Sequence, residues 1–481
     1  MERKSIKLNY LFNAAYQVFN LITPLITTPY LSRVLQPDGI GRVSYVESIV
    51  SNFALVAVMG ISIYGQREIS YVQDDITKRS EVFWNVKILS FIISGLTILA
   101  YILFAVIQKE NFLLYFILTL NLISIFIDVD WFFQGMEDFA KTVTRNAVCK
   151  ILLIVYIFAF VKDKNDLPFY VLGCGLSAVL GSASLWIYLP KYVKKIPFCK
   201  LRPFKDFKVV WALFIPTIAT QVYTVLDKTM IGLITKNSFE NGYYEQSQKI
   251  VRLALTLVTA ISAVIMPRMG YLFKKKKYDE IYAYMYRSCR FVWFLGFPLC
   301  LGIIMTARNF VPWFFGMGYD KVVPNLFVQS IIIPVVGIGN VTGIQYLLPT
   351  KRQNLFTYSV VCGAVVNIIL NTILIRMYAS LGASIASIIA ELTVTGVQLV
   401  FVRKELSIIQ ILREGKSYFV AGAIMAMVLF ISGKYLSSTI VNTIILVVIG
   451  IITYFAILMI ERDEFLISNF KKILKRFSAK T

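Results

Sequence analysis

The chain of 481 residues contains no histidine. This absence excludes histidine-based acid–base catalysis, histidine metal ligands and histidine proton relays. Its six cysteines include no CxxC pair, and most lie in or beside apolar runs, where a free thiol behaves as a small hydrophobe. They therefore predict neither a disulfide framework nor a zinc site. We expect no metal and no cofactor.

Long polar stretches are also scarce. Hydrophobic residues make up 57% of the chain, and the mean hydropathy is +0.69. Crossing the ~30 Å hydrocarbon core of a bilayer takes roughly 20 mostly apolar residues, and about fourteen runs reach that length. The spans are predicted at 8–33, 43–66, 83–107, 111–133, 144–161, 167–190, 209–234, 246–270, 289–307, 324–348, 355–376, 381–402, 417–433 and 439–460. The predicted fold class is an all-α integral membrane protein.

Acidic residues are few, with 27 Asp and Glu against 49 Lys and Arg, giving a net charge of +22. The basic residues cluster in alternate gaps: with the N-terminus inside, about 33 fall in inside segments and about 10 in outside segments. This asymmetry predicts that both termini lie in the cytoplasm, and the C-terminus lies in the basic tail at 471–481. It also favours membrane lipids over nucleic acid as the partner of the basic loops. The start, MERKSIKLNY, leads directly into a span, so we expect no cleavable signal peptide.

The predicted outside loops are short. The longest, at 308–323, is aromatic and has the composition of a segment at the membrane interface. Membrane glycosyltransferases and polysaccharide polymerases usually need a large external loop to hold a catalytic site. The chain is therefore predicted not to be an enzyme.

A faint repeat relates the two halves of the chain. Residues 22–28 (ITPLITT) resemble 215–220 (IPTIAT), and each run precedes a glycine-containing turn with Gly41 or Gly242. Arg67 and Arg268 then lie equally far beyond these glycines. A parallel repeat fits two six-helix lobes related by an axis along the membrane normal. The predicted domains are an N-lobe at 1–190, a basic linker at 191–208, a C-lobe at 209–402, and two extra spans with the tail at 403–481.

Several charged side chains fall inside predicted spans, where each costs roughly 2.5–3.5 kcal/mol at the bilayer centre. Glu245, Lys249 and Arg252 are three and four residues apart and share one helical face, which indicates an anion-binding patch in a hydrated cavity. The candidate substrate-binding residues are Lys228, Lys249, Arg252, Arg33 and Arg42, and the candidate cavity or coupling carboxylates are Asp227, Glu245, Glu47, Glu391 and Asp128. Structural ion pairs and snorkelling at helix ends are the alternative interpretation.

The order of several motifs resembles the polysaccharide transporter family, whose members flip lipid-linked oligosaccharide repeat units. The motifs are LITPLITTPYLSRVLQPDGIGRVSYVESIV, GISIYGQREIS, DWFFQGMEDFAKTVTRN, VLDKTMIGLI, GYYEQSQKIV and VIMPRMG. The resemblance implies membership of the multidrug/oligosaccharidyl-lipid/polysaccharide (MOP) exporter superfamily. It implies two six-helix lobes in a V around a central cavity, with two additional C-terminal helices, working by alternating access. It also implies a location in the bacterial cytoplasmic membrane.

The function implied by this resemblance is a flippase for undecaprenyl-diphosphate-linked oligosaccharides in capsule or O-antigen synthesis. A polysaccharide polymerase, a chain-length regulator and a coupling ion (H⁺ or Na⁺) are candidate partners. A drug or organic-cation exporter is an alternative, although it would need an acid-rich cavity. A peptidoglycan-precursor flippase is less favoured, because no arginine lies between Lys7 and Arg33. A scaffold for other capsule enzymes, using the basic loops, stays open.

Overall fold

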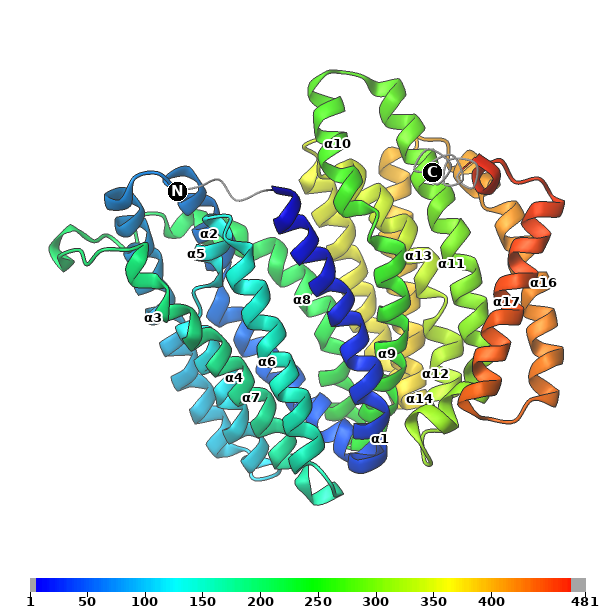
Figure 1. Ribbon diagram of the computed structural model, residues 1–481, viewed down its shortest axis with the longest axis horizontal. Coiled ribbons are helices and arrows are strands. Elements are labelled where there is room, and N and C mark those ends of the chain that lie inside the picture. Colours follow the sequence, from blue (N-terminus) through cyan, green and yellow to red (C-terminus); the bar gives the residue numbers. More distant parts are fainter. Residues whose placement is uncertain (1–5, 469–481) are drawn as a thin grey trace, which may run out of the picture. The chain divides into compact units, whose positions relative to one another are not determined.

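The structure is a computed structural model that describes the backbone of residues 6–468. Side chains are described throughout this range except at 6–18, 20, 21, 139, 140, 198, 215, 216, 219, 220, 222–224 and 263. The basic tail at 471–481 therefore lies outside the described residues, and of the repeat at 215–220 the backbone is described together with the side chains of 217 and 218. The described part is helical and contains no β-strand, which confirms the all-α prediction (Figure 1).

The chain forms two compact units, one reaching Gly242 and the other beginning at Tyr243. The N-terminal unit contains α1 (Ile6–Val58), α2 (Ile61–Tyr71), α3 (Ile76–Ile107), α4 (Phe112–Ile127), α5 (Asp130–Gly135), α6 (Phe139–Phe160), α7 (Leu167–Ser184) and α8 (Phe207–Thr235), with short 3-10 turns η1 (Lys164–Asp166), η2 (Leu185–Ile187), η3 (Leu189–Lys191) and η4 (Phe198–Lys200). The first turn of α9 also belongs to it. The predicted lobe boundary at the basic linker, 191–208, stays a prediction from the repeat.

The C-terminal unit contains the rest of α9 (Ser238–Thr259), α10 (Ser262–Lys274), α11 (Tyr278–Phe315), α12 (Val322–Gln329), α13 (Ile332–Asn340), the π-helix η5 (Val341–Leu347), α14 (Gln353–Val402), α15 (Ile408–Glu414), α16 (Lys416–Tyr435) and α17 (Ile440–Ile460). Its core is a cluster of buried apolar side chains that includes Val258, Cys289, Phe315, Leu347 and Tyr418.

Among the described residues, eleven helical segments are long and apolar enough to cross a membrane. Two of these segments, Ile22–Tyr71 and Gln353–Val402, are 50 residues long. At 1.5 Å per residue each would measure about 75 Å, more than twice the hydrocarbon thickness. α1 bends at Gln36 (φ 58°, ψ 172°), because the following Pro37 disfavours a helical conformation in the preceding residue. α14 bends at Ala379 (φ 51°, ψ −127°). If each of the two 50-residue segments is divided at its bend and α8 is added, the eleven segments become fourteen, which equals the number of predicted spans.

Contacts between loops in the N-terminal unit agree with alternate crossing of the membrane. The Tyr30 hydroxyl donates to Val161 O at 2.7 Å, joining the ends of the first and fifth predicted spans. The Gln73 amide donates to Gly135 O at 2.6 Å, and Arg79 donates to Tyr192 O at 2.7 Å, joining the gaps after the second, fourth and sixth spans. Odd and even gaps thus gather at different faces of this unit.

The C-terminal unit sorts its loops in the same way. Asn309 donates to Leu436 O at 2.7 Å, which joins the end of the ninth span to the gap after the thirteenth. Arg352 and Glu405 join the gaps after the tenth and twelfth spans, with Arg352 Nη1 at 2.7 Å and Nη2 at 2.5 Å from the carboxylate. The assignment of these faces to cytoplasm and exterior stays a prediction from the basic loops.

The Arg352–Glu405 pair predicts a pH-dependent contribution to stability. The hydrogen bond from Arg352 holds the pKa of the Glu405 carboxyl below its ordinary value of 4.5, although partial burial opposes this effect. The contribution is therefore complete above about pH 4.5 and is lost as pH falls through the folded-state pKa. We expect Arg352→Gln to lower the free energy of unfolding in detergent by about 1 kcal/mol or less near neutral pH. This loss of unfolding free energy should shrink in acid. The control variant Lys351→Gln, at the neighbouring residue, should show no loss. A loss that does not depend on pH would contradict the prediction.

Candidate functional site

Helices α1 and α8 pack against each other inside the N-terminal unit, along stretches that carry predicted site residues. Thr229 Oγ1 on α8 donates to Ser48 Oγ on α1 at 2.8 Å. Lys228 and Glu47, both half-buried, are the sequence neighbours of these two residues, and the contact therefore places their stretches of helix side by side. Asp227 is only 3% exposed. Three predicted site residues thus lie on the stretches of α1 and α8 that pack together.

Arg33 and Arg42 lie on either side of the bend in α1. Both side chains are exposed, and Arg42 Nη2 is 3.0 Å from the Asp38 carboxylate one helical turn earlier. The pair is partly solvated, so its net energy is at most about 1 kcal/mol and an incoming anion could compete for the arginine. The structure therefore leaves Arg42 available as a candidate ligand at the end of a span.

In the C-terminal unit, α9 carries the predicted basic face. Lys249 Nζ is 3.6 Å from Glu245 Oε1, and their side chains are 34% and 15% exposed. Arg252, three residues beyond Lys249, is exposed. The predicted approach of Glu245 and Lys249 across one turn is confirmed, while the binding role of this face stays a prediction. Glu391 lies on α14, half-buried between the buried Ala390 and the exposed Leu392.

Asp128 lies at a break between α4 and α5, next to a buried lysine that the sequence analysis missed. The Lys87 side chain is fully buried and donates to Phe126 O at 2.7 Å and Asp128 O at 2.8 Å. Trp186 Nε1 donates to Ile127 O at 2.7 Å. A helix that ends inside a membrane leaves carbonyl groups without intrahelical partners, and each unsatisfied group there costs several kcal/mol. Lys87 and Trp186 satisfy three consecutive carbonyls and so stabilise the break.

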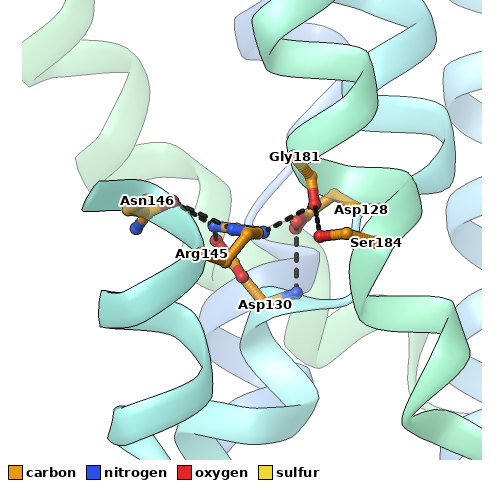
Figure 2. A network of polar contacts seen from close by, with 6 residues as sticks. All are labelled: Asp128, Asp130, Arg145, Asn146, Gly181 and Ser184. Carbon is orange, nitrogen blue, oxygen red and sulfur yellow. Dashed lines mark hydrogen bonds and ion pairs between the residues drawn. The ribbon is translucent and has the colours of Figure 1, made fainter. Parts of the chain in front are cut away.

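Arg145 on α6 completes this network, and the sequence analysis missed it too (Figure 2). Its Nη2 is 2.7 Å from Asp130 Oδ2, and its guanidinium also donates to Asn146 and, at 3.4 Å, to Gly181 O. Asp128 Oδ1 accepts from the backbone N–H of Asp130 at 3.1 Å. Two cations, Lys87 and Arg145, thus face two carboxylates. Formal charges cancel, so the network favours a structural role over selective binding of an ion of either sign.

A cavity of about 220 Å³ adjoins the network, lined by Asp128, Asp130, Ser62 and Ser124 among others. The Asp130 Oδ1 atom is buried and without a hydrogen-bond partner in the described part of the chain. A coupling role for Asp128 stays a prediction. The signal that could have identified Lys87 and Arg145 was in the sequence, since each is a basic residue inside a predicted apolar span, at 83–107 and 144–161.

Comparison with known proteins gives the family and the fold. Residues 6–273 match the family described as "Polysaccharide biosynthesis protein". A protein of Escherichia coli (strain K12) named "Putative O-antigen transporter" is 22% identical over 83% of this chain and 97% of its own length. A protein of the same name from Shigella dysenteriae is 21% identical over 82% of this chain and 98% of its own.

Two solved structures show the same fold. The Lipid II flippase MurJ in its inward closed conformation has a TM-score of 0.73 and 18% identity, covering 94% of this chain and 99% of MurJ. An inward-facing multidrug-resistance MATE transporter of the MOP superfamily has a TM-score of 0.63 and 13% identity, covering 84% of this chain and 96% of its own. These relatives and neighbours are transporters and flippases, not enzymes.

The family match covers more than half of the chain, and the two solved structures share its fold. This multi-span integral membrane protein belongs to the family described as "Polysaccharide biosynthesis protein".

Proposed function

We propose that this protein flips undecaprenyl-diphosphate-linked oligosaccharide repeat units from the inner to the outer leaflet of the bacterial cytoplasmic membrane. The observation that carries the proposal is the likeness to two proteins named as O-antigen transporters over nearly their whole lengths. The product would serve a capsule or another surface polysaccharide. Both termini would lie in the cytoplasm, as the basic loops predict.

The basic face of α9 supports an anionic lipid headgroup as the substrate feature that is bound. Lys249 and Arg252 would bind the diphosphate through charge-assisted hydrogen bonds, which are roughly twice as strong as neutral ones. Lys228, Arg33 and Arg42 would supply further positive charge. Glu245 is already 3.6 Å from Lys249 and would compete with the diphosphate for it, which favours release.

The mechanism we propose is alternating access. The sugar and diphosphate would cross through the protein while the lipid tail stays in the bilayer, because burying the tail in a polar cavity would forfeit its favourable solvation by lipid. Asp227, Glu47, Glu391 and Asp128 are the candidate carboxylates for coupling to H⁺ or Na⁺. A polymerase and a chain-length regulator would act on the product outside.

Export of drugs or organic cations is the second candidate function, supported by the likeness to MATE transporters. Transport of a peptidoglycan precursor is the third, supported by the likeness to MurJ. At 13% and 18% identity these likenesses concern the fold alone. The family match and the cations on α9 favour the polysaccharide precursor over both.

A deletion strain tests the proposal. We expect loss of surface polysaccharide, with the lipid-linked oligosaccharide accumulating in the inner leaflet, and recovery of both when the gene is restored. We also expect the deletion strain to keep its resistance to cationic drugs, which would argue against the second candidate function. Normal surface polymer in the deletion strain, or increased drug susceptibility with no trapped precursor, would contradict the proposal.

A further inference from the structure

A cavity of about 600 Å³ lies between the basic linker and the helices α2 and α3 of the N-terminal unit. Its walls come from these two helices, from residues 199–206 of the linker and from the first turn of α8. Sites that bind small molecules usually enclose about 300–1,000 Å³. None of the candidate substrate-binding or coupling residues named above lines this cavity. It is therefore separate from the sites already described and large enough to hold a ligand.

Hydrogen bonds hold the linker wall of the cavity in place. Trp84 Nε1 on α3 donates to Lys194 O at 3.0 Å. Further along the linker, the backbone N–H of Arg202 donates to Asn85 Oδ1 at 2.7 Å. Both contacts use backbone groups of the linker, so they do not depend on its side chains. The wall is thus formed before any ligand binds, and little affinity is lost in ordering it.

Most acidic side chains of the cavity are engaged in contacts of their own, whereas its basic side chains are not. Asp206 Oδ2 accepts from the Tyr64 hydroxyl at 2.7 Å, and Glu68 Oε1 is 2.8 Å from Arg67 Nη2. Of the lining carboxylates, only the exposed Glu81 remains. Three lining cations form no ion pair and no side-chain hydrogen bond with the described residues: Lys200, Arg202 and Lys205. The cavity therefore presents an excess of positive charge to an anion.

The α3 wall of the cavity is apolar and continues into the predicted span. Val86 and Leu89 line the cavity within the predicted span 83–107. Beyond Leu89, α3 carries exposed apolar side chains at intervals of three or four residues: Ile92, Leu96, Leu99 and Leu103. This spacing keeps them on one face of the helix, below the cavity. An exposed apolar stripe within a span faces lipid, so an acyl chain can lie on it while its headgroup occupies the cavity.

We propose that this cavity binds the headgroup of an anionic phospholipid. The phosphate would lie among Lys200, Arg202 and Lys205, the glycerol against Val86 and Leu89, and an acyl chain along the exposed stripe of α3. A zwitterionic headgroup would bring its own ammonium group to the basic wall, so a net negative headgroup is favoured. The basic loops predict that this face of the unit is cytoplasmic, which assigns the lipid to the inner leaflet.

Two other phosphate-bearing ligands fit this cavity less well. A soluble phosphate would use the cations but neither the apolar wall nor the stripe of α3. The lipid-linked precursor would have to leave this lipid-facing surface for a path through the protein, whereas a resident phospholipid stays on it. The inference goes beyond the proposed flippase function and does not depend on it, because the site needs only a membrane that contains anionic lipid.

Binding of phosphatidylglycerol to the full-length protein, purified in detergent and measured by native mass spectrometry, tests the site. We expect it to bind in preference to phosphatidylcholine with the same acyl chains. Changing Lys200, Arg202 and Lys205 together to glutamine should weaken this binding roughly 100-fold, or about fivefold for each charge removed. The variant should unfold at the wild-type temperature without lipid, because these three side chains form no hydrogen bond in the described part of the chain.

The matched control changes three other exposed basic residues of the same linker, Lys191, Lys194 and Lys195, to glutamine. This variant loses the same charge but keeps the cavity lining intact, so it should bind phosphatidylglycerol as the wild type does. An equal loss in both variants, or equal binding of phosphatidylcholine, would reduce the effect to the general attraction of a basic segment and overturn the site. Displacement of the lipid by glycerol 1-phosphate or by undecaprenyl diphosphate at the same concentration would assign the cavity to a soluble anion or to the transport substrate instead.

Discussion

Replacing Lys249 and Arg252 together with alanine is expected to abolish polymer export while the amount of protein in the membrane stays normal. Both residues project from one face of α9, and each would lose a charge-assisted hydrogen bond to the diphosphate, worth roughly 1.5–3 kcal/mol. Losing both corresponds to a fall in affinity of roughly 10²–10⁴-fold. The single variants should export weakly, and Arg252→Lys should retain part of the function because it keeps the charge but not the planar two-pronged donor.

The matched control removes the same charge from a loop. Lys275 and Lys276 lie between α10 and α11, and changing both to alanine also lowers the net charge by two. This variant should export normally, since these lysines lie outside the predicted spans. The measurement is surface polymer per cell, normalised to membrane protein. Wild-type export by the Lys249→Ala, Arg252→Ala variant would discard the α9 face as the binding site.

Replacing Lys87 with methionine is expected to destabilise the protein by about 3–5 kcal/mol, the usual cost of removing one partner from a buried ionic network. Methionine roughly preserves the volume but donates no hydrogen bond. Phe126 O and Asp128 O would then be left without their donor at the break between α4 and α5. Thermal unfolding in detergent and the yield of folded protein would report the loss.

Two further variants separate the contribution of charge from that of packing. Lys162→Met, at an exposed lysine after α6, should leave the unfolding temperature nearly unchanged. Adding Asp128→Asn to Lys87→Met should recover part of the loss, because it removes the carboxylate left uncompensated, while the two carbonyls would still lack their donor. A Lys87→Met protein as stable as the wild type would show that the break is not stabilised by this lysine.

The location of the spans was predictable from the sequence because hydropathy and charge are local properties. Runs such as 83–107 and 439–460 appear as the helices α3 and α17, and the bend in α1 follows from Pro37 acting on Gln36. The approach of Glu245 and Lys249 was predictable for the same reason, since residues four apart on one helix are neighbours whatever surrounds them.

Local sequence properties could not predict the contacts between residues that lie far apart along the chain. Lys87 bonds a carbonyl 41 residues away, and its role depends on α4 ending at Ile127, which no pattern in the apolar run 111–133 indicates. Similarly, the sequence shows that the linker is basic, but not that Lys200, Arg202 and Lys205 line one cavity with α3. The sequence determined the spans, their alternation and the basic face of α9, because each depends on neighbours along the chain. Which charges meet at the break, and which cations share a cavity, depended on how the helices pack, because those free energies arise only once separate segments lie side by side.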